Sequence, residues 1–213
     1  MEKKKIVIVG GGSFICNLIN YIDSMSEYDI VGYTDVQDNG AFYDVPYLGT
    51  DDILPVLFQQ GVQYAAIAIG NRLSNTATKQ KVFANLKSIG FHLPVIKGQG
   101  VIIHRGVEIG EGSIVRDGAI IQSNCKLGDC VMIGDRAVIS HDTTIGDFSQ
   151  VVTGCVLGRG ITVGKSVFFG FCSIVTNDLT IVDNCIIGAN SLVNKSCLMA
   201  GKYFGTPAKL KAE

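Results

Sequence analysis

Two adjacent side chains stand out for the chemistry they could perform: His141 and Asp142, in the segment VISHDTTIGD at 138–147. A histidine takes up and releases a proton near neutral pH, and a carboxylate beside it can fix its tautomer and stabilise its protonated form. The chain has only two other histidines, His92 and His104. The pair could equally be an exposed histidine and aspartate without a function, so the surrounding pattern has to be considered.

The pair lies within a repeat of six residues. An aliphatic or aromatic residue recurs at every sixth position from Ile103 to Val193, sixteen times without a break, and the residue four places further on is small or aliphatic. A period of six fits neither an amphipathic helix nor a simple alternating strand. It is typical of a hexapeptide-repeat β-helix, in which each repeat supplies one short strand and one corner, and three repeats close a triangular coil.

This register places the histidine and the aspartate. His141 and Asp142 are the third and fourth residues of the hexad that begins at Ile139, so neither belongs to the inward-facing positions. We therefore expect both at a corner or on the outer face of the β-helix. The tail from about Lys195, which includes KYFGTPAKL at 202–210, is expected to cover one open end of the rod.

The residues before the repeat alternate between strand and helix patterns. The strand-like segments are KIVIVG (5–10), DIVGYTD (29–35) and YAAIAIG (64–70), and the helix-like segments are 13–25, 50–61 and 76–90. Ser13 is a candidate N-cap for the first helix, and Gly90 ends the last one. The pattern predicts a small parallel sheet with helices on its faces, a Rossmann-like half. We expect an α/β domain over 1–97, followed by a parallel β-helix domain over 98–213.

Composition excludes several classes of function. The 18 basic and 19 acidic residues nearly balance, and no basic run beyond Lys3–Lys5 predicts a nucleic-acid surface. No apolar stretch is long enough for a membrane span, and the N-terminus does not look like a signal peptide, so we expect a cytoplasmic protein. The seven cysteines show no C-x-x-C spacing, which favours reduced core thiols and no metal site.

The repeat, with FGTPAK at 204–209, VIVGGGSF at 7–14 and AIAIGN at 66–71, resembles the bacterial sugar O-/N-acyltransferases. That family includes sialic acid O-acetyltransferases and the N-acetyltransferases of bacillosamine- and perosamine-type amino sugars. The resemblance implies a left-handed β-helix, acetyl-CoA as cosubstrate, and a homotrimer in which acetyl-CoA lies between neighbouring β-helices. It also implies a role in surface glycan synthesis, such as that of lipopolysaccharide or capsule, with a sugar or nucleotide-sugar held by the N-terminal domain.

The resemblance also implies a set of site residues. For catalysis it implies His141 as general base and Asp142 as the carboxylate that orients it. For acetyl-CoA it implies Gln150, Phe171, Gly188 and Ala189, and for the sugar substrate Gly12, Ser13, Asp35, Gly70 and Asn71. A glycine turn at a helix N-terminus can hold a phosphate through backbone amides, which gives Gly12 and Ser13 a physical reason to touch a diphosphate.

The chain departs from the family pattern at several positions. Phe14 stands where relatives have a histidine, and Val36 replaces a second acidic residue after Asp35. Gln150 replaces a second histidine, so it can hydrogen-bond the thioester or the pantetheine arm but cannot carry charge. Arg159, where relatives often have glycine, could meet a phosphate of CoA or simply cover the outer surface.

Other functions stay open at this stage. The turn GGGSF followed by Asp35 has some likeness to a nicotinamide-binding fingerprint, but Ile15 stands where the third glycine belongs. A zinc-dependent β-helical hydratase would need three converging histidines. A non-catalytic β-helix scaffold would leave the glycine turn and the His–Asp pair unexplained. Within the acyltransferases, we favour acetylation of the amine of a nucleotide-linked amino sugar, with O-acetylation of sialic acid or another sugar hydroxyl as the alternative.

Overall fold

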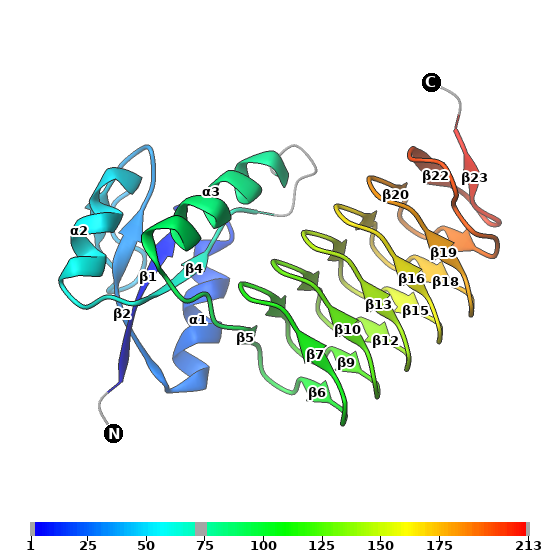
Figure 1. Ribbon diagram of the computed structural model, residues 1–213, viewed down its shortest axis with the longest axis horizontal. Coiled ribbons are helices and arrows are strands. Elements are labelled where there is room, and N and C mark those ends of the chain that lie inside the picture. Colours follow the sequence, from blue (N-terminus) through cyan, green and yellow to red (C-terminus); the bar gives the residue numbers. More distant parts are fainter. Residues whose placement is uncertain (1–2, 71–75, 212–213) are drawn as a thin grey trace. The chain divides into compact units, whose positions relative to one another are not determined.

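The structure is a computed structural model that describes residues 3–70 and 76–211. The chain divides into two compact units, 1–96 and 97–213. Each unit has its own arrangement of strands (Figure 1).

The N-terminal unit is a four-stranded parallel sheet with helices. The strands are β1 (Lys4–Val9), β2 (Tyr28–Thr34), β3 (Tyr47–Gly49) and β4 (Tyr64–Ile67), in the order β3-β2-β1-β4. The helices are α1 (Ile15–Met25), the short 3-10 helix η1 (Asp51–Ile53), α2 (Leu54–Gln59) and α3 (Thr76–Ile89). The parallel sheet and the three longer strands confirm the sequence prediction, whereas the short edge strand β3 was not predicted.

Burial explains these elements. The run Ile6 to Val9 is buried, as a central strand covered on both faces requires, and α1 turns Ile15, Leu18 and Ile22 inward. The prediction of Ser13 as the N-cap of α1 is wrong. The N-cap is Phe14, which makes no side-chain cap hydrogen bond, and the chain enters the helix through a turn in which the Ile15 N–H donates to the Gly12 carbonyl.

The second unit is a left-handed parallel β-helix whose coils stack along one axis (Figure 1). Side 1 consists of β6 (Ile102–Ile103), β9 (Ile120–Ile121), β12 (Val138–Ile139), β15 (Val156–Leu157), β18 (Ile174–Val175) and β21 (Leu192–Val193). Side 2 consists of β7 (Glu108–Ile109), β10 (Lys126–Leu127), β13 (Thr144–Ile145), β16 (Thr162–Val163) and β19 (Thr180–Ile181). Side 3 consists of β5 (Ile96–Lys97), β8 (Ile114–Val115), β11 (Met132–Ile133), β14 (Gln150–Val151), β17 (Phe168–Phe169), β20 (Ile186–Ile187), β22 (Lys202–Phe204) and β23 (Lys209–Leu210).

The sixfold period is confirmed. Each strand from β6 to β21 ends on a residue of the predicted inward register, and strands pair with partners 18 residues away, such as Lys126 with Thr144. Small residues at the fifth position are buried too. The Ser149 hydroxyl donates to the Gly164 carbonyl (2.9 Å) and accepts the Val167 N–H (3.0 Å), so a polar core residue is satisfied by the next coil.

The corners owe their shape to the fourth residue of each hexad. At this position the backbone is left-handed, with φ of 60° at Asn124, 58° at Asp142 and 59° at Asn184. Asparagine and aspartate tolerate this conformation better than most residues. Every corner therefore has a similar backbone, and the side chains of its third and fourth residues are free to vary.

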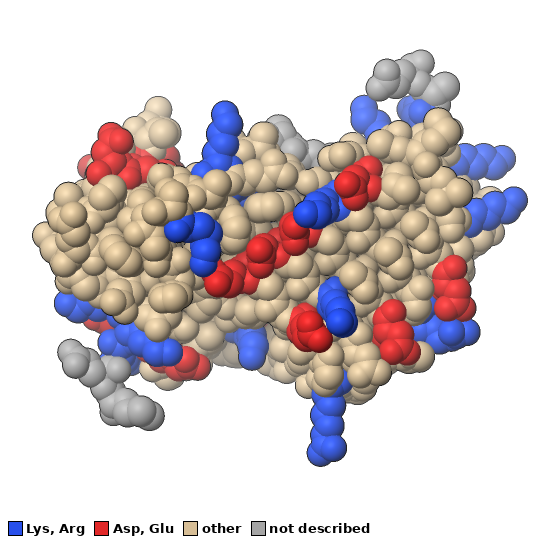
Figure 2. Space-filling model, in the orientation of Figure 1, with Lys and Arg blue, Asp and Glu red and all other residues tan. Residues whose placement is uncertain are grey.

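The corner between sides 2 and 3 carries a row of charged side chains: Glu111, Asp129, Asp147, Lys165 and Asp183. Figure 2 shows such a row of acidic side chains, interrupted by a basic one, along the β-helix. The carboxylates of Asp129 and Asp147 each accept the backbone N–H of the residue before them in the row (2.9 and 3.1 Å). These two carboxylates therefore link successive coils by hydrogen bonds.

The C-terminal segment closes the end of the rod, as predicted. β22 extends side 3 by pairing parallel to β20, and β23 folds back antiparallel to β22. Tyr203 joins the core, and its hydroxyl donates to the Met199 carbonyl (2.9 Å). No helix among residues 3–70 and 76–211 has the length and apolar character needed to cross a bilayer.

Candidate active site

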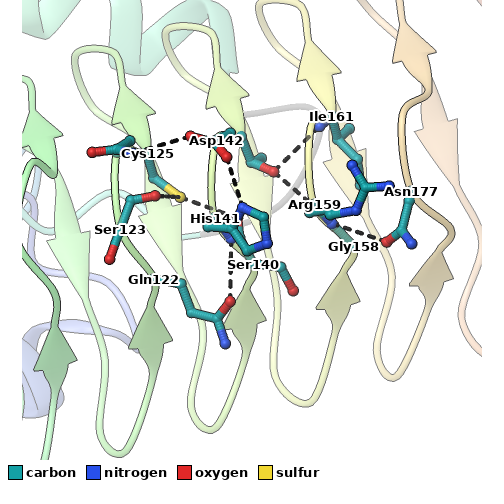
Figure 3. Close-up of polar contacts among 12 residues, drawn as sticks. Gln122, Ser123, Cys125, Ser140, His141, Asp142, Gly158, Arg159, Ile161 and Asn177 are labelled. Carbon is teal, nitrogen blue, oxygen red and sulfur yellow. Dashed lines mark hydrogen bonds and ion pairs between the residues drawn. The ribbon is translucent and has the colours of Figure 1, made fainter.

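His141 and Asp142 lie at the corner between sides 1 and 2, after β12, as the register predicts. Both side chains are exposed, and Figure 3 shows the imidazole lying beside the carboxylate on the outer surface. The neighbouring Ile139 and Thr143 are fully buried. The hexad therefore anchors the pair in the core on both sides while leaving its two functional groups accessible.

One hydrogen bond fixes the tautomer of the imidazole. Nδ1 of His141 lies 2.7 Å from Oδ2 of Asp142. The hydrogen bond from His141, followed by one from Asn124, holds the pKa of the Asp142 carboxyl below its ordinary value of 3.8. An ionised carboxylate can only accept, so Nδ1 is the donor and Nε2 carries the free lone pair. The arrangement leaves a proton acceptor pointing away from Asp142.

The coil before the pair supports it from below. The side-chain oxygen of Gln122 accepts the backbone N–H of His141 (3.2 Å), and Nδ2 of Asn124 donates to Oδ1 of Asp142 (3.2 Å). Neither residue was predicted. The repeat could have identified both, because residues 18 apart stack in neighbouring coils and residues 122–124 lie 18 positions before 140–142.

Arg159, in the coil after the pair, is engaged with another residue of the same corner. Its guanidinium forms two contacts of 3.1 Å, one with each carboxylate oxygen of Asp178. Its backbone N–H donates to the side-chain oxygen of Asn177 (3.1 Å), which lies in the next coil (Figure 3). Its charge also contributes to the lowered pKa of Asp142.

The residues expected at acetyl-CoA lie elsewhere on the β-helix. Phe171, Gly188 and Ala189 share the corner between sides 3 and 1, where the Phe171 carbonyl accepts the N–H of Asn190 (2.8 Å). Phe171 is 59% exposed. Within one chain, these residues are therefore brought together with one another but not with His141, which is at the corner between sides 1 and 2.

Gln150 is the first residue of β14, on side 3. It is 2% exposed, and its side-chain oxygen has no hydrogen-bond partner among the described residues. Gln150 and His141 belong to different sides of one β-helix, so they do not meet within a single chain.

The predicted substrate loops meet at the carboxyl end of the parallel sheet. The turn Gly10–Gly12 follows β1, Asp35 follows β2 and Gly70 follows β4, and these three strands are neighbours. The Gly11 N–H donates to Oδ2 of Asp35, and the Val36 N–H donates to Oδ1 (2.6 Å). The carboxyl ends of parallel strands are the usual place for a ligand in open α/β sheets.

The glycines of these loops differ in whether the surrounding residues leave room for a side chain. A Cβ on Gly10 would lie 3.2 Å from the Ala68 backbone, and one on Gly11 would lie 2.6 Å from the Tyr33 ring. A Cβ on Gly12 or Gly70 would meet no described residue within 4 Å, and neither glycine has a left-handed φ. Internal packing thus explains Gly10 and Gly11 but not Gly12 or Gly70, and Gly12 and Ser13 are exposed. Asn71 lies outside the described residues.

Among residues 3–70 and 76–211, no group of three or more histidine, cysteine, aspartate or glutamate side chains is arranged to hold a metal ion. All seven cysteines lie in this part of the chain and are free thiols. Cys125, Cys155, Cys185 and Cys197 are buried in the small inward register, which confirms their place in the core.

The chain is similar to a known family and to several solved structures. The family described as PglD N-terminal domain matches residues 5–86. The acetyltransferase domain of PglB from Neisseria gonorrhoeae has a TM-score of 0.90 at 21% identity, with 98% of this chain and 100% of that chain covered. Its complex with acetyl coenzyme A has a TM-score of 0.87 at 21% identity, covering 99% and 100%. These two establish the common fold.

A more similar sequence comes from Caulobacter crescentus. A histidine-to-alanine mutant of its GDP-perosamine N-acetyltransferase, in complex with CoA and GDP-perosamine, has a TM-score of 0.89 at 27% identity, covering 98% of this chain and 97% of that chain. The shared architecture thus spans both units, the PglD-type N-terminal domain and the β-helix. The chain is therefore an acyltransferase, similar over nearly its whole length to sugar acetyltransferases with a hexapeptide-repeat β-helix.

Proposed function

We propose that this protein transfers the acetyl group of acetyl-CoA to the amine of a nucleotide-linked amino sugar, with His141 as general base. The observation that carries the proposal is the exposed His141–Asp142 pair, in which Nε2 is left free to accept a proton. The donor and acceptor classes are those of the Caulobacter enzyme, whose complex contains CoA and GDP-perosamine.

The proposed reaction is a single acyl transfer. The amine nitrogen attacks the thioester carbonyl carbon, and Nε2 of His141 takes the proton that the amine loses. As the tetrahedral intermediate collapses, the C–S bond breaks and the CoA thiolate leaves, to be protonated from the imidazolium or from water. Asp142 stabilises the imidazolium formed in the transfer. A positioned base of this kind accelerates such a reaction about 10² to 10⁴-fold.

The nucleotide part of the acceptor fits the N-terminal unit. No contact with residues 3–70 or 76–211 requires glycine at Gly12 or Gly70, and both lie at the carboxyl edge of the sheet. A diphosphate approaching the backbone amides of Gly12 and Ser13 at the start of α1 would supply that reason. Asp35 holds the Gly11 turn in the shape this approach needs.

The donor site is proposed to form between copies of the chain. His141 flanks side 1 at one corner, and Phe171, Gly188 and Ala189 flank side 1 at the other. In a threefold arrangement with side 1 facing its neighbours, the corner that carries His141 in one copy meets the corner that carries Phe171, Gly188 and Ala189 in the next. With coils about 4.8 Å apart, Phe171 and Ala189 would lie about 8 and 13 Å further along the axis than His141, a line suited to an extended pantetheine arm.

The outer surface of side 1 supports this assembly. Its outward-facing residues are all aliphatic: Ile102, Ile120, Val138, Val156, Ile174 and Leu192. The matching residues of side 2 are all polar: Glu108, Lys126, Thr144, Thr162 and Thr180. Ile102, Val156 and Ile174 are 49%, 39% and 46% exposed. A continuous apolar stripe of this kind marks an interaction surface, and a homotrimer would bury it.

The free thiols are consistent with a location in the cytoplasm. Disulfides are rare in the reducing cytoplasm, and all seven cysteines are unpaired. We place the enzyme there, at a step of surface glycan synthesis that uses a nucleotide-sugar.

Thiol release from acetyl-CoA tests the proposal. The acceptors would be GDP-perosamine and UDP- and dTDP-linked amino sugars, each beside the matching nucleotide-sugar with a hydroxyl in place of the amine, and free sialic acid. We expect release with at least one amine acceptor, a product heavier by one acetyl group, and much slower release with its hydroxyl counterpart. Release with only the hydroxyl acceptors would replace the proposal by O-acetylation, and no release with any acceptor would contradict it.

A further inference from the structure

Resting on the function proposed above, we propose that Asn124 is a positioning residue that holds the Asp142 carboxylate in the orientation required by His141. Asn124 lies one coil before Asp142, at the same corner and at the same fourth position of its hexad. The residue acts through Asp142 and has no contact with the imidazole of His141 among the interactions found between described residues.

The two oxygens of the Asp142 carboxylate are held from different directions. Oδ2 meets Nδ1 of His141 at 2.7 Å, and Oδ1 accepts Nδ2 of Asn124 at 3.2 Å. A carboxylate with one bonded oxygen can rotate about its Cβ–Cγ bond, and an exposed one has water as a competing partner. The second bond restricts this rotation, so Oδ2 stays in line with Nδ1. Together with Gln122, which accepts the His141 backbone N–H (3.2 Å), the preceding coil thus fixes both members of the pair.

The fold itself does not need an asparagine at this place. In the same corner, the equivalent fourth positions one coil before and two coils after Asn124 are Gly106 and Gly160, with φ of 76° and 65°. Asn124 has a φ of 60°, the same left-handed conformation. Glycine adopts this conformation without strain, so the backbone requirement is met without any side chain. The amide of Asn124 has its partner in Asp142.

Replacing Asn124 by glycine is the direct test, because it removes the amide and keeps the backbone geometry. The matched control is Asn184→Gly, since Asn184 is an exposed asparagine at the fourth position of its hexad with a φ of 59°, at the corner between sides 2 and 3. We expect Asn124→Gly to lower kcat about 10-fold through misorientation of the base, with the KM values for acetyl-CoA and for the nucleotide-sugar unchanged. Asn184→Gly should leave all three parameters as in the unmodified protein.

A double-mutant cycle with Asp142→Ala shows whether Asn124 acts through the carboxylate. If it does, the double variant Asp142→Ala with Asn124→Gly has the same kcat as Asp142→Ala alone, because the group that Asn124 positions is already absent. Losses that multiply would overturn the proposal, and so would a kcat for Asn124→Gly within twofold of the unmodified protein. A His141→Ala variant separates the proposed function of the enzyme from the proposed role of Asn124. Full activity of His141→Ala contradicts the proposed function, whereas its inactivity beside an unimpaired Asn124→Gly contradicts only the role of Asn124.

Discussion

The tautomer of His141 follows from the ionisation of a single carboxylate. The hydrogen bonds from His141 and Asn124 lower the pKa of Asp142, so the carboxylate remains charged at pH values below its ordinary range. The carboxylate therefore accepts the Nδ1 proton of His141 to lower pH than an aspartate without these two hydrogen bonds would.

Asp142→Asn tests the role of this carboxylate. The amide keeps the shape of the side chain but removes its negative charge, so the imidazolium formed in the transfer is less stabilised. We expect kcat to fall about 100-fold, because Nδ1–H no longer has a charged acceptor that fixes the tautomer. The control is Asp178→Asn, at the same hexad position of the same corner, which should keep the kcat of the unmodified enzyme. An unchanged kcat in Asp142→Asn would contradict the role of the carboxylate.

The sequence could predict where this pair lies but not what surrounds it. The hexad register places His141 and Asp142 outward because inward positions must be aliphatic or small, and the structure agrees. Arg159 was left open between two roles, and its bidentate contact with Asp178 depends on side-chain conformations that no spacing specifies. The roles assigned to the loop residues from Gly12 to Asn71 stay predictions.

At the scale of elements, corners and loops use glycine for different reasons. A Cβ on Gly146 would lie 2.7 Å from the backbone of Gly164 in the next coil, and stacked coils leave no room for either backbone to move. A Cβ on Gly12 would meet nothing within 4 Å. Gly146 is therefore required by packing between coils, whereas no packing contact requires glycine at Gly12, where we propose that a diphosphate approaches the backbone.

Two alanine substitutions should separate these reasons. Gly146→Ala is expected to lower the free energy of unfolding by about 1 to 3 kcal/mol through overpacking, seen as a lower Tm. Gly12→Ala should leave the Tm unchanged and raise the KM for the nucleotide-sugar, with the KM for acetyl-CoA unaffected. Thermal unfolding and steady-state kinetics of both variants decide the matter. An unchanged KM in Gly12→Ala would remove this residue from the substrate site.

The elements themselves were predictable to different degrees. The strands of the β-helix from β6 to β21 follow from the sequence because each buried residue recurs at a fixed interval and pairs with its equivalent in the next coil. β3 has three residues, all half-buried, at the edge of its sheet, and so carries no alternation to detect. The start of α1 was misplaced because Ser13 is a favoured N-cap residue, while the actual turn at Gly12–Ile15 is held by backbone hydrogen bonding.

For the whole molecule, the contrast between sides 1 and 2 leads to a prediction about assembly. A double variant Val156→Lys with Ile174→Lys places two charges in the aliphatic stripe, and we expect it to dissociate the proposed homotrimer and to lose acetyl transfer, because desolvating these charges opposes association. The control variant Thr162→Lys with Thr180→Lys makes the same change on side 2 and should remain trimeric and active. Light scattering coupled to gel filtration measures the mass. A trimer that survives the first variant unchanged would exclude side 1 as the interface.

The most direct test of the central claim compares two histidine variants of the enzyme. His141→Ala and His104→Ala are to be assayed for thiol release with saturating acetyl-CoA and the best amine acceptor. His104 is the matched control because it is an exposed histidine of the same corner, two coils before the pair, with no assigned role. We predict that His141→Ala loses about 10² to 10⁴-fold in kcat at an unchanged Tm, while His104→Ala keeps the activity of the unmodified protein. A His141→Ala enzyme as fast as the unmodified one would contradict the account.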